Sequence, residues 1–319
     1  MHANFSLLRH PGLQRRAKAI AVLCSGGLLL PLVSPFEASL PDSMAWGLDL
    51  AVHWQWFFLA GLALALPVLV CARRRWFMLA ALLPLPWFTA MPDAVRGADG
   101  GDALVVAAAN VHVDNEAPDR LVQWVGATKP DVLAILEISD TFAQRLGLDD
   151  IYPYRVVRPR GDPFGVALLS RHPVLRHVVV EEDGATPRIE AVLDWHGTEV
   201  TVVAFHPMPP ISAADHGQRN RVLADIAARY ADRPTIVAGD FNATPWSSAF
   251  RAPRRKGFTV ASGLQATWPA PLRGLIGLPI DHVMLSRHWS VIDRAVGPDL
   301  GSDHLPIQAS VATSRNVGR

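Results

Sequence analysis

Three long stretches without a charged side chain dominate the first ninety residues, and they constrain the fold more than any other feature. They run over residues 19–36, 54–72 and 76–91. Each approaches the roughly 20 residues that an α-helix needs to cross a bilayer. Tryptophans stand at their margins, as is typical of the aromatic belt at a membrane interface. Buried core helices are the alternative, but three in succession before a soluble domain favour three transmembrane helices.

The charges around these stretches predict an orientation. Arg15, Arg16 and Lys18 precede the first stretch, Arg73–Arg75 separates the second from the third, and the loop at 37–53 carries acidic residues and no Lys or Arg. The positive-inside rule therefore places the N-terminus and the arginine turn in the cytoplasm. Three crossings then leave the rest of the chain outside. A cleaved signal peptide is the alternative for the first stretch, but no small-x-small cleavage site follows it closely.

After a membrane region at 1–91 and a polar linker at 92–102, the sequence changes to that of a soluble domain over 103–312, followed by a tail at 313–319. Apolar runs with strand character recur through this domain. They cover residues 104–111, 131–137, 165–171, 176–182, 188–195, 199–206, 235–241, 280–286 and 305–311.

Two helices are predicted within the domain, at 119–128 and at 213–231. The second opens at Ser212 with Asp215 three residues later, an imperfect capping box. Several strands follow one another without a helix between them, which argues against a purely parallel sheet. We therefore predict two mixed β-sheets flanked by helices, a four-layer α/β sandwich, preceded by three transmembrane helices.

Polar residues suited to phosphate-ester chemistry stand where these apolar runs end. They are Asn110, Glu137, His206, Asp240, Asn242, Asp281, Asp303 and His304. Carboxylate and amide oxygens are hard ligands that suit Mg²⁺. The only cysteines, Cys24 and Cys71, lie in the apolar region, so a disulfide framework is absent from the domain and a thiolate zinc site is disfavoured. The overall balance of 30 basic and 29 acidic residues does not demand a nucleic-acid partner.

Six motifs carry these residues in a characteristic order: AAANVHVDN, LAILEIS, VVAFHPMPP, GDFNATPWSS, IDHVMLS and GSDHLPI. The combination resembles the endonuclease/exonuclease/phosphatase superfamily, which includes deoxyribonucleases, abasic-site endonucleases, bacterial sphingomyelinases and inositol-polyphosphate phosphatases. The resemblance covers about residues 103–312. It implies a Mg²⁺- or Mn²⁺-dependent phosphoesterase in which metal-activated water hydrolyses phosphodiester or phosphomonoester bonds of nucleic acid or phospholipid head groups.

The resemblance also implies a role for each residue. Glu137 would be the principal metal ligand, with Asn110 beside it and Asp303 contributing to the same site. Asp240 would orient and deprotonate the attacking water, and Asn242 would hold the phosphate or that water.

His304 would contact the phosphoryl oxygen, with its ring oriented by Asp281. His206 would protonate the leaving oxygen or stabilise the transition state, although the run at 165–171 lacks the acidic partner that deoxyribonucleases carry there. Arg188 is a further candidate for binding substrate, with a surface arginine as the alternative.

Bacterial members of the superfamily with membrane anchors exist. The expectation is therefore a multi-pass protein of the bacterial inner membrane, bound to the lipid bilayer by three helices and with its catalytic domain in the periplasm. The stretch at 263–279, rich in glycine and proline, is expected to form a mobile loop beside the substrate. A second hypothesis, from another functional class, is a catalytically silent membrane protein that uses the same fold as a binding module.

Overall fold

The structure is a computed structural model of the whole chain and describes residues 8–95, 102–182 and 185–314. The chain divides into two compact units. Unit 1 comprises Met1–Met91 together with Trp246–Ser248, and unit 2 comprises Pro92–Pro245 and Ala249–Arg319. Each unit is described separately below.

Unit 1 is helical. Its elements are α2 (Pro11–Val33), the 3-10 helix η1 (Ser34–Ser39), α3 (Asp42–Val52), α4 (Gln55–Ala72), the 3-10 helix η2 (Arg74–Leu82) and α5 (Leu85–Ala90). α2 and α4 pack as an antiparallel pair. Gln14 near the start of α2 donates to the carbonyl of Val68 in α4, and Gln55 at the start of α4 donates to the carbonyl of Gly27 in α2. The two side-chain amides thereby bond to backbone carbonyls of the opposite helix.

Two of the predicted spans correspond to helices that are long and apolar enough to cross a membrane, one within Pro11–Ser39 and one at Gln55–Ala72. At 1.5 Å per residue, α2 is about 34 Å long and α4 about 27 Å, close to the roughly 30 Å of a hydrocarbon core. Most residues of both apolar windows are not buried within the chain. Length, composition and exposure agree with a lipid environment for these two segments.

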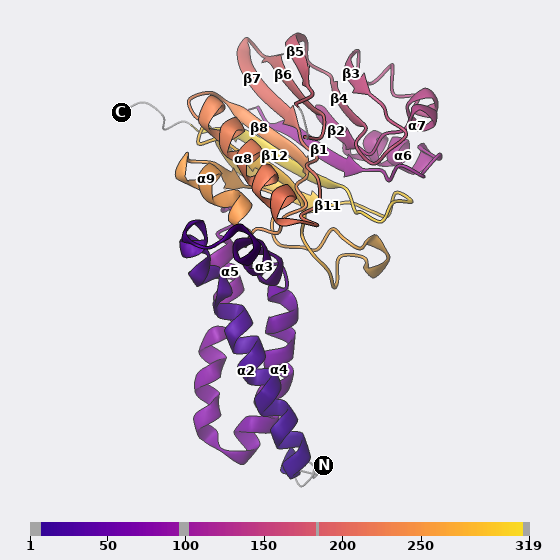
Figure 1. Cartoon of the computed structure of the whole chain (residues 1–319). Coiled ribbons are helices and arrows are strands. Elements are labelled where there is room, and N and C mark those ends of the chain that lie inside the picture. The colour runs from indigo at the N-terminus through magenta and orange to yellow at the C-terminus, as the bar shows by residue number, and fades with distance from the viewer. Residues whose placement is uncertain (1–7, 96–101, 183–184, 315–319) are drawn as a thin grey trace. The chain divides into compact units, whose positions relative to one another are not determined.

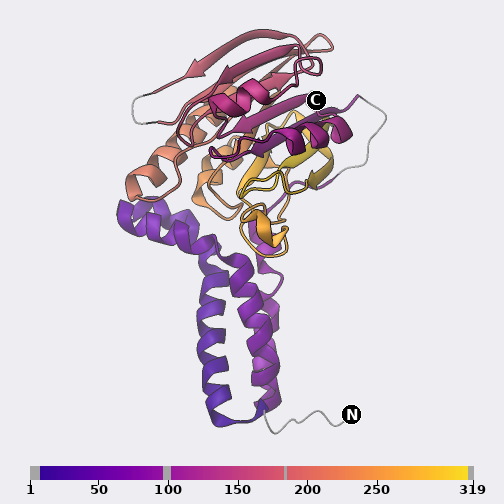
Figure 2. The same cartoon turned by 90° about the vertical axis from the view of Figure 1, so that its right-hand side faces the viewer.

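The third predicted span, residues 76–91, does not form one α-helix of spanning length. It is divided between η2 and α5, and Pro84 and Pro86 lie where the helix type changes, because proline lacks the N–H that an α-helix needs. The segment nevertheless runs back along α4: Trp87 of α5 lies against Trp56 at the start of α4, with ring centroids 5.0 Å apart. The chain therefore passes along unit 1 three times (Figures 1 and 2).

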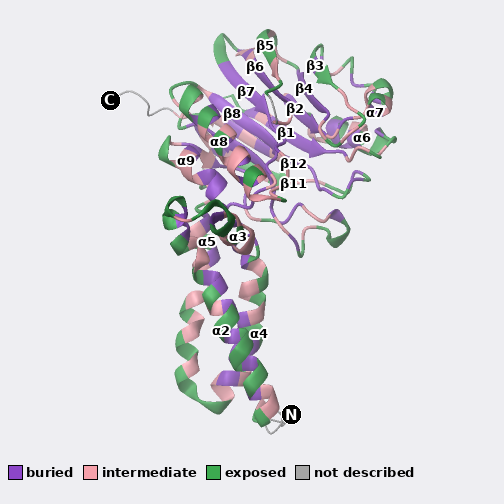
Figure 3. Cartoon of the chain, viewed as in Figure 1, coloured by how far each residue is buried: buried purple, intermediate pink, exposed green. Residues whose placement is uncertain are grey.

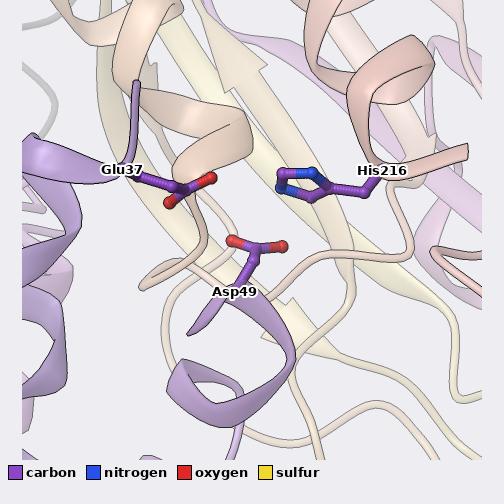
Figure 4. Close-up of side chains that lie close together, drawn as sticks. All are labelled: Glu37, Asp49 and His216. Atoms are coloured by element: carbon purple, nitrogen blue, oxygen red, sulfur yellow. The ribbon is translucent and has the colours of Figure 1, made fainter. Parts of the chain in front are cut away.

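The acidic segment between the first two spans also differs from a simple solvated loop. It forms η1 and α3, and its carboxylates Glu37 and Asp49, drawn in Figure 4, are both buried. Asp49 accepts hydrogen bonds from the hydroxyl of Ser247 at 2.9 Å and from the backbone N–H of Ser248 at 2.8 Å. These bonds explain how a buried carboxylate is tolerated within unit 1.

Unit 2 contains two six-stranded sheets. Its strands are β1 (Leu104–Asn110), β2 (Val132–Leu136), β3 (Tyr154–Arg158), β4 (Val166–Ser170), β5 (Val174–Val180), β6 (Arg188–Trp195), β7 (Thr198–Ala204), β8 (Thr235–Asp240), β9 (Thr259–Val260), β10 (Asp281–Leu285), β11 (Trp289–Val296) and β12 (Ile307–Thr313). Sheet A has the order β11-β12-β1-β2-β4-β3, and sheet B has the order β5-β6-β7-β8-β10-β9. One pair in each sheet is parallel, β1 with β2 and β7 with β8, and the other pairs are antiparallel.

The helices and short 3-10 turns of unit 2 lie between these strands in sequence. They are α6 (Asp119–Thr128), α7 (Asp140–Arg145), α8 (Ala213–Tyr230), η3 (Ser248–Phe250), α9 (Arg251–Arg255) and η4 (Ala270–Leu272). At the start of α8, the hydroxyl of Ser212 accepts a hydrogen bond from the N–H of Asp215, as the predicted cap requires.

Three apolar cores hold these layers together. Alternate residues of both sheets, such as Val106 and Ile236, form the core between the sheets. The other face of sheet A packs against α6 and α7, and the other face of sheet B packs against α8 and η3. The strands accordingly show as mostly buried in Figure 3. The predicted arrangement of two mixed sheets flanked by helices is confirmed for unit 2.

The predicted linker at 92–102 is ordered at its start. Asp93 accepts a hydrogen bond from the hydroxyl of Thr259, and its N–H donates to Val260, so it packs on sheet B. Val95 forms a bridge with Val291. Residues 96–101 lie outside the described residues. Unit 2 thus begins at Pro92, within the segment expected to be a linker.

Candidate active site

Strand alternation places four of the predicted residues on the inner faces of the two sheets, at one edge of the sandwich. Asn110 has the parity of Ala108 on β1, and Asp240 has that of Ala238 on β8. Asp281 at the start of β10 is directly opposite Asp240 in the antiparallel register. His206, two residues beyond the end of β7, continues the inward-facing parity of that strand. Residues from both sheets therefore meet at this edge.

Glu137 reaches the same edge through an unusual backbone conformation. It follows β2, where simple alternation would turn its side chain to the outer face, but its φ is +60°. A left-handed conformation at a non-glycine residue is uncommon and costs of order 1–3 kcal/mol. Gly165 makes room for it, since a Cβ there would overlap the carbonyl oxygen of Ile138. The strain is consistent with a functional demand on the position of this carboxylate.

The side-chain amide of Asn110 joins two carboxylates. Its Nδ2 donates to Glu137 Oε1 at 2.8 Å and lies 3.3 Å from Asp240 Oδ2, while its Oδ1 accepts from the N–H of His112. The second oxygen of Glu137 accepts from the N–H of Val113 at 3.2 Å. One neutral amide thus holds carboxylates from sheets A and B close together.

Asp240 occupies the centre of the group. Its Oδ1 accepts from the N–H of Asn242, which has a φ of +47° and closes the turn. Its Oδ2 faces both histidines, 3.5 Å from His206 Nε2 and 3.7 Å from His304 Nε2. Gly239, the residue before Asp240, lets the end of β8 lie close to the backbone just after β7, because a Cβ there would overlap the carbonyl oxygen of Phe205. One oxygen therefore holds the turn and the other faces the cluster.

His304 and Asp281 form the predicted pair. His304 Nδ1 donates to Asp281 Oδ2 at 2.9 Å, and both side chains are buried. Burial alone would lower the pKa of His304, but the carboxylates of Asp281 and Asp240 and this hydrogen bond raise it to about 10. The imidazole is therefore cationic at neutral pH, with Nε2 directed toward Asp240.

His206 has neighbours that the sequence did not indicate. The strand β4 is uncharged, as expected, yet His206 Nε2 lies 4.0 Å from Glu137 Oε1 as well as 3.5 Å from Asp240 Oδ2. Its ring is also 5.6 Å from that of Phe164, and its buried Nδ1 has no hydrogen-bond partner among the described residues. Glu137 and Asp240 thus supply the acidic neighbours of His206 that strand β4 does not.

Asp303 and Asn242 lie at the border of the group. Asp303 Oδ2 accepts from the indole N–H of Trp268 at 3.1 Å, and its backbone oxygen accepts from Ala270. Asn242 donates through its side-chain amide to the carbonyl of Pro207, next to His206. The sequence indicated Trp268 only as part of a loop, and its bond to Asp303 depends on a contact between residues 35 positions apart.

Arg188 lies apart from the cluster, and its suggested contact with the phosphate finds no support. Ile189 points into the core between the sheets, so Arg188 faces the opposite side of sheet B. Its guanidinium donates to Glu190 and to Glu182, and Tyr230 of α8 donates to the same Glu190. The arginine is also buried rather than on the surface, as the alternative reading had placed it. A buried ion-pair network accounts for it.

The cluster fits a divalent cation. Ligand atoms of Asp240, Asp281 and His304 all lie within 4.8 Å of one another, Glu137 is linked to Asp240 through Asn110, and the exposed Asp303 lies at the border. Oxygen donors from carboxylates and an amide are the set that Mg²⁺ or Mn²⁺ accepts. Of the predicted metal ligands, Asn110 contacts both Glu137 and Asp240 through its side-chain amide. The donor set is therefore suited to a hard divalent cation.

This geometry can be set against known proteins. The sequence matches the Endonuclease/Exonuclease/phosphatase family over residues 107–304. The chain belongs to that family. Its members are typically phosphoester hydrolases and generally use a divalent metal. The match begins in β1 and ends at His304, so it includes every residue of the cluster.

Solved structures of the family share the fold of unit 2. An endonuclease/exonuclease/phosphatase from Beutenbergia cavernae is 20% identical, with a TM-score of 0.56, over 67% of this chain and 72% of the other. A humanized D. rerio TDP2 is 16% identical, with a TM-score of 0.55, over 66% and 99%. D. rerio TDP2 with a single-strand DNA product is 17% identical, with a TM-score of 0.53, over 67% and 100%. No curated protein matches the chain in sequence.

Proposed function

We propose that this chain is a membrane-anchored, Mg²⁺- or Mn²⁺-dependent phosphoesterase that hydrolyses phosphodiester or phosphomonoester bonds of nucleic acid or phospholipid head groups. One observation carries the proposal: Asp240 Oδ2 is approached by an amide and two imidazoles, while the same amide bonds Glu137. A base, an acid and a cation site are thereby gathered at one edge of the sandwich.

Each side chain has a role that its surroundings support. A bound divalent cation would neutralise the phosphate oxygens and lower the pKa of a bound water, with Glu137, Asn110 and Asp303 as its proposed ligands. Asp240 accepts a proton from the attacking water, since its Oδ2 is directed into the cluster. Asn242 holds that water or a phosphate oxygen.

The two histidines supply positive charge and protons. His304, cationic because Asp281 supports its protonated form, donates from Nε2 to a phosphoryl oxygen. His206 donates to the leaving oxygen, and its Nε2 lies within 4.0 Å of carboxylate oxygens of both Glu137 and Asp240. Positioned acid–base groups of this kind each contribute about 10²–10⁴-fold to a rate.

Anchoring and topology are part of the proposal. α2, α4 and the combined η2–α5 segment would be three crossings, and η2–α5 exposes large apolar side chains such as Phe77, Met78 and Phe88, as a lipid-facing surface would. Basic residues at the N-terminus and at Arg73–Arg75 then place the domain outside the cytoplasm, in the periplasm of a bacterial cell. An even number of crossings would instead leave it inside.

A substrate panel tests the activity. The full chain in detergent micelles would be assayed with Mg²⁺, Mn²⁺ or chelator on bis(p-nitrophenyl) phosphate, p-nitrophenyl phosphate, single-stranded DNA and phospholipid vesicles. DNA belongs in the panel because D. rerio TDP2 has been solved with a single-strand DNA product. We expect metal-dependent hydrolysis of at least one class, reduced about 10²–10⁴-fold by Asp240→Asn. A folded chain that binds metal and hydrolyses none of them would support the silent binding module instead.

A further inference from the structure

The segment Thr267–Leu278 of unit 2 forms a closed, hydrogen-bonded loop. The N–H of Leu278 donates to the carbonyl of Trp268 at 2.7 Å, and the N–H groups of Thr267 and Trp268 donate to the carbonyl of Leu278. Between these ends, η4 is followed by a turn in which Leu275 donates to Leu272 at 3.0 Å. The sequence predicted a mobile loop here. These backbone hydrogen bonds instead hold the segment in a defined shape.

The tip of this loop is apolar and exposed. Leu275 is 86% exposed, the highest value among the large apolar side chains of the described residues, and Ile276 is 56% exposed. Leu272 is also exposed. Between Ser262 and Asp281 the only charged residue is Arg273. Isolated exposed apolar residues are ordinary, but three on one ordered turn beside a single cation have the composition of an interfacial lipid-binding element.

The base of the loop is bonded directly to the candidate active site. Ala270 donates from its N–H to the backbone oxygen of Asp303, and the indole of Trp268 donates to the Asp303 carboxylate. The hydroxyl of Thr267 accepts from the N–H of Asp281 at 3.2 Å. A surface that holds the tip of the loop would therefore be coupled through a few hydrogen bonds to two residues of the cluster.

Chain connectivity favours a bilayer as that surface. Asp93, already bonded to sheet B, is only three residues beyond Ala90, the last residue of α5. A domain that begins so soon after a region with two helices long enough to span a membrane stays close to whatever bilayer they enter. Arg273 adds attraction to the anionic phosphates of lipid head groups.

We propose that the tip of the loop, Leu272–Ile276, inserts into the membrane interface and directs the active site toward phosphoesters carried at the lipid surface. Leu275 and Ile276 would enter the boundary between head groups and acyl chains, and Arg273 would bind head-group phosphate. The insertion itself is independent of the proposed function, whereas the choice of a lipid-borne substrate rests on it.

Fluorescence quenching in reconstituted full chain tests the insertion. Ile276→Cys, in a Cys24→Ala/Cys71→Ala background, would be labelled with an environment-sensitive NBD group in phosphatidylcholine/phosphatidylglycerol nanodiscs. Leu175→Cys is the matched control, since Leu175 on β5 is 50% exposed and lies on the strand at the opposite edge of sheet B from β9. Phospholipid with a doxyl group near the head should quench the label at 276 at least twofold and leave the label at 175 unchanged.

Equal quenching at the two positions, or none at 276, would overturn the proposal. Absence of quenching at 276 is also the result expected if the tip binds a protein partner instead of lipid. Arg273→Gln should reduce the quenching at 276 in anionic discs, but not in discs of phosphatidylcholine alone. Hydrolysis of bis(p-nitrophenyl) phosphate, measured in the same discs, separates the two hypotheses. Retained hydrolysis without quenching removes the insertion alone, and quenching without hydrolysis removes the proposed activity alone.

Discussion

The helical unit 1 and the α/β unit 2 encode their proposed roles in opposite ways. In unit 1 the role is spread over many interchangeable apolar side chains, and exact identity matters only where α2 and α4 approach closely, as at Gly27 beside Phe58. In unit 2 the role rests on a few polar side chains from both sheets, held by single hydrogen bonds such as that from Asn110 to Glu137. Single substitutions should therefore abolish function in one region and be tolerated at most positions in the other.

The largest effect is expected at Asp240. Asp240→Asn keeps the shape of the side chain and an acceptor for the Asn242 N–H, but it removes the proposed base. We expect turnover of bis(p-nitrophenyl) phosphate to fall about 10²–10⁴-fold with little change in melting temperature, measured on full chain in detergent. If activity survived, the base would lie elsewhere and the contrast between the two regions would weaken.

The next effect concerns the Asp281–His304 pair. Asp281→Asn and His304→Ala should each reduce activity about 10²-fold or more, and the double mutant should be scarcely worse than His304→Ala alone, because the residues act as one unit. Losses that simply multiply would show that the two side chains work independently.

The same pair predicts a pH dependence of stability in the metal-free chain. The pKa of His304 is raised from 6.5 to about 10, so its contribution to stability is fully present below about pH 6.5 and is lost as the pH rises through about 10. Asp281→Asn removes the negative charge that raises the pKa of His304 most, so NMR titration of the His304 ring should show its pKa falling. An unchanged value would mean that Asp281 does not support the cation.

A smaller effect is expected from filling space between α2 and α4. A Cβ at Gly27 would overlap the ring of Phe58, whereas a Cβ at neighbouring Gly26 meets nothing within 4 Å. Both substitutions to Leu gain helix propensity, so the difference between them isolates packing. Gly27→Leu should be less stable than Gly26→Leu by about 1–3 kcal/mol, as measured by thermal unfolding in detergent. Equal stability would indicate that the two helices are not packed in this way.

The smallest energetic effect, with a clear readout, concerns topology. Replacing Arg73, Arg74 and Arg75 with Gln removes the positive charges that the positive-inside rule assigns to this cytoplasmic turn and leaves unit 2 unchanged. A reporter fused after Gly101 should report export in the parent chain and a mixture of orientations in the variant. A reporter that behaves as cytoplasmic in the parent would contradict the three-crossing arrangement.

Much of the domain was predictable because each motif places polar candidate site residues at the end of an apolar strand. The predicted helix at 119–128 is α6, and every predicted strand is present with ends shifted by a few residues. The strands β3 and β11 were missed because charge interrupts their apolar pattern: β3 reads YRVVR, and β11 contains Asp293 and Arg294 beside a register shift. Short strands with exposed, charged positions carry no clear period-2 signal.

The remaining differences depend on contacts between distant residues. The carboxylates around His206 come together only when sheets A and B meet, and the left-handed conformation of Glu137 depends on the space beside Gly165. Residue alternation on β6 turned Arg188 away from the cluster, although its position in the sequence had suggested a phosphate contact. In unit 1, hydropathy located the segment at 76–91 but could not show that prolines divide it into two helix types.

The most direct test of the central claim measures metal binding and turnover in the same samples. Mn²⁺ would be titrated by calorimetry into full chain in nanodiscs, for the parent and for Glu137→Gln, with hydrolysis of bis(p-nitrophenyl) phosphate followed in each. We predict that chelator abolishes turnover in the parent, and that Glu137→Gln weakens Mn²⁺ affinity about 10–100-fold or more and lowers turnover in parallel, with the fold intact. Turnover that persists in chelator, or unchanged affinity and rate in Glu137→Gln, would contradict a metal-dependent phosphoesterase site at this cluster.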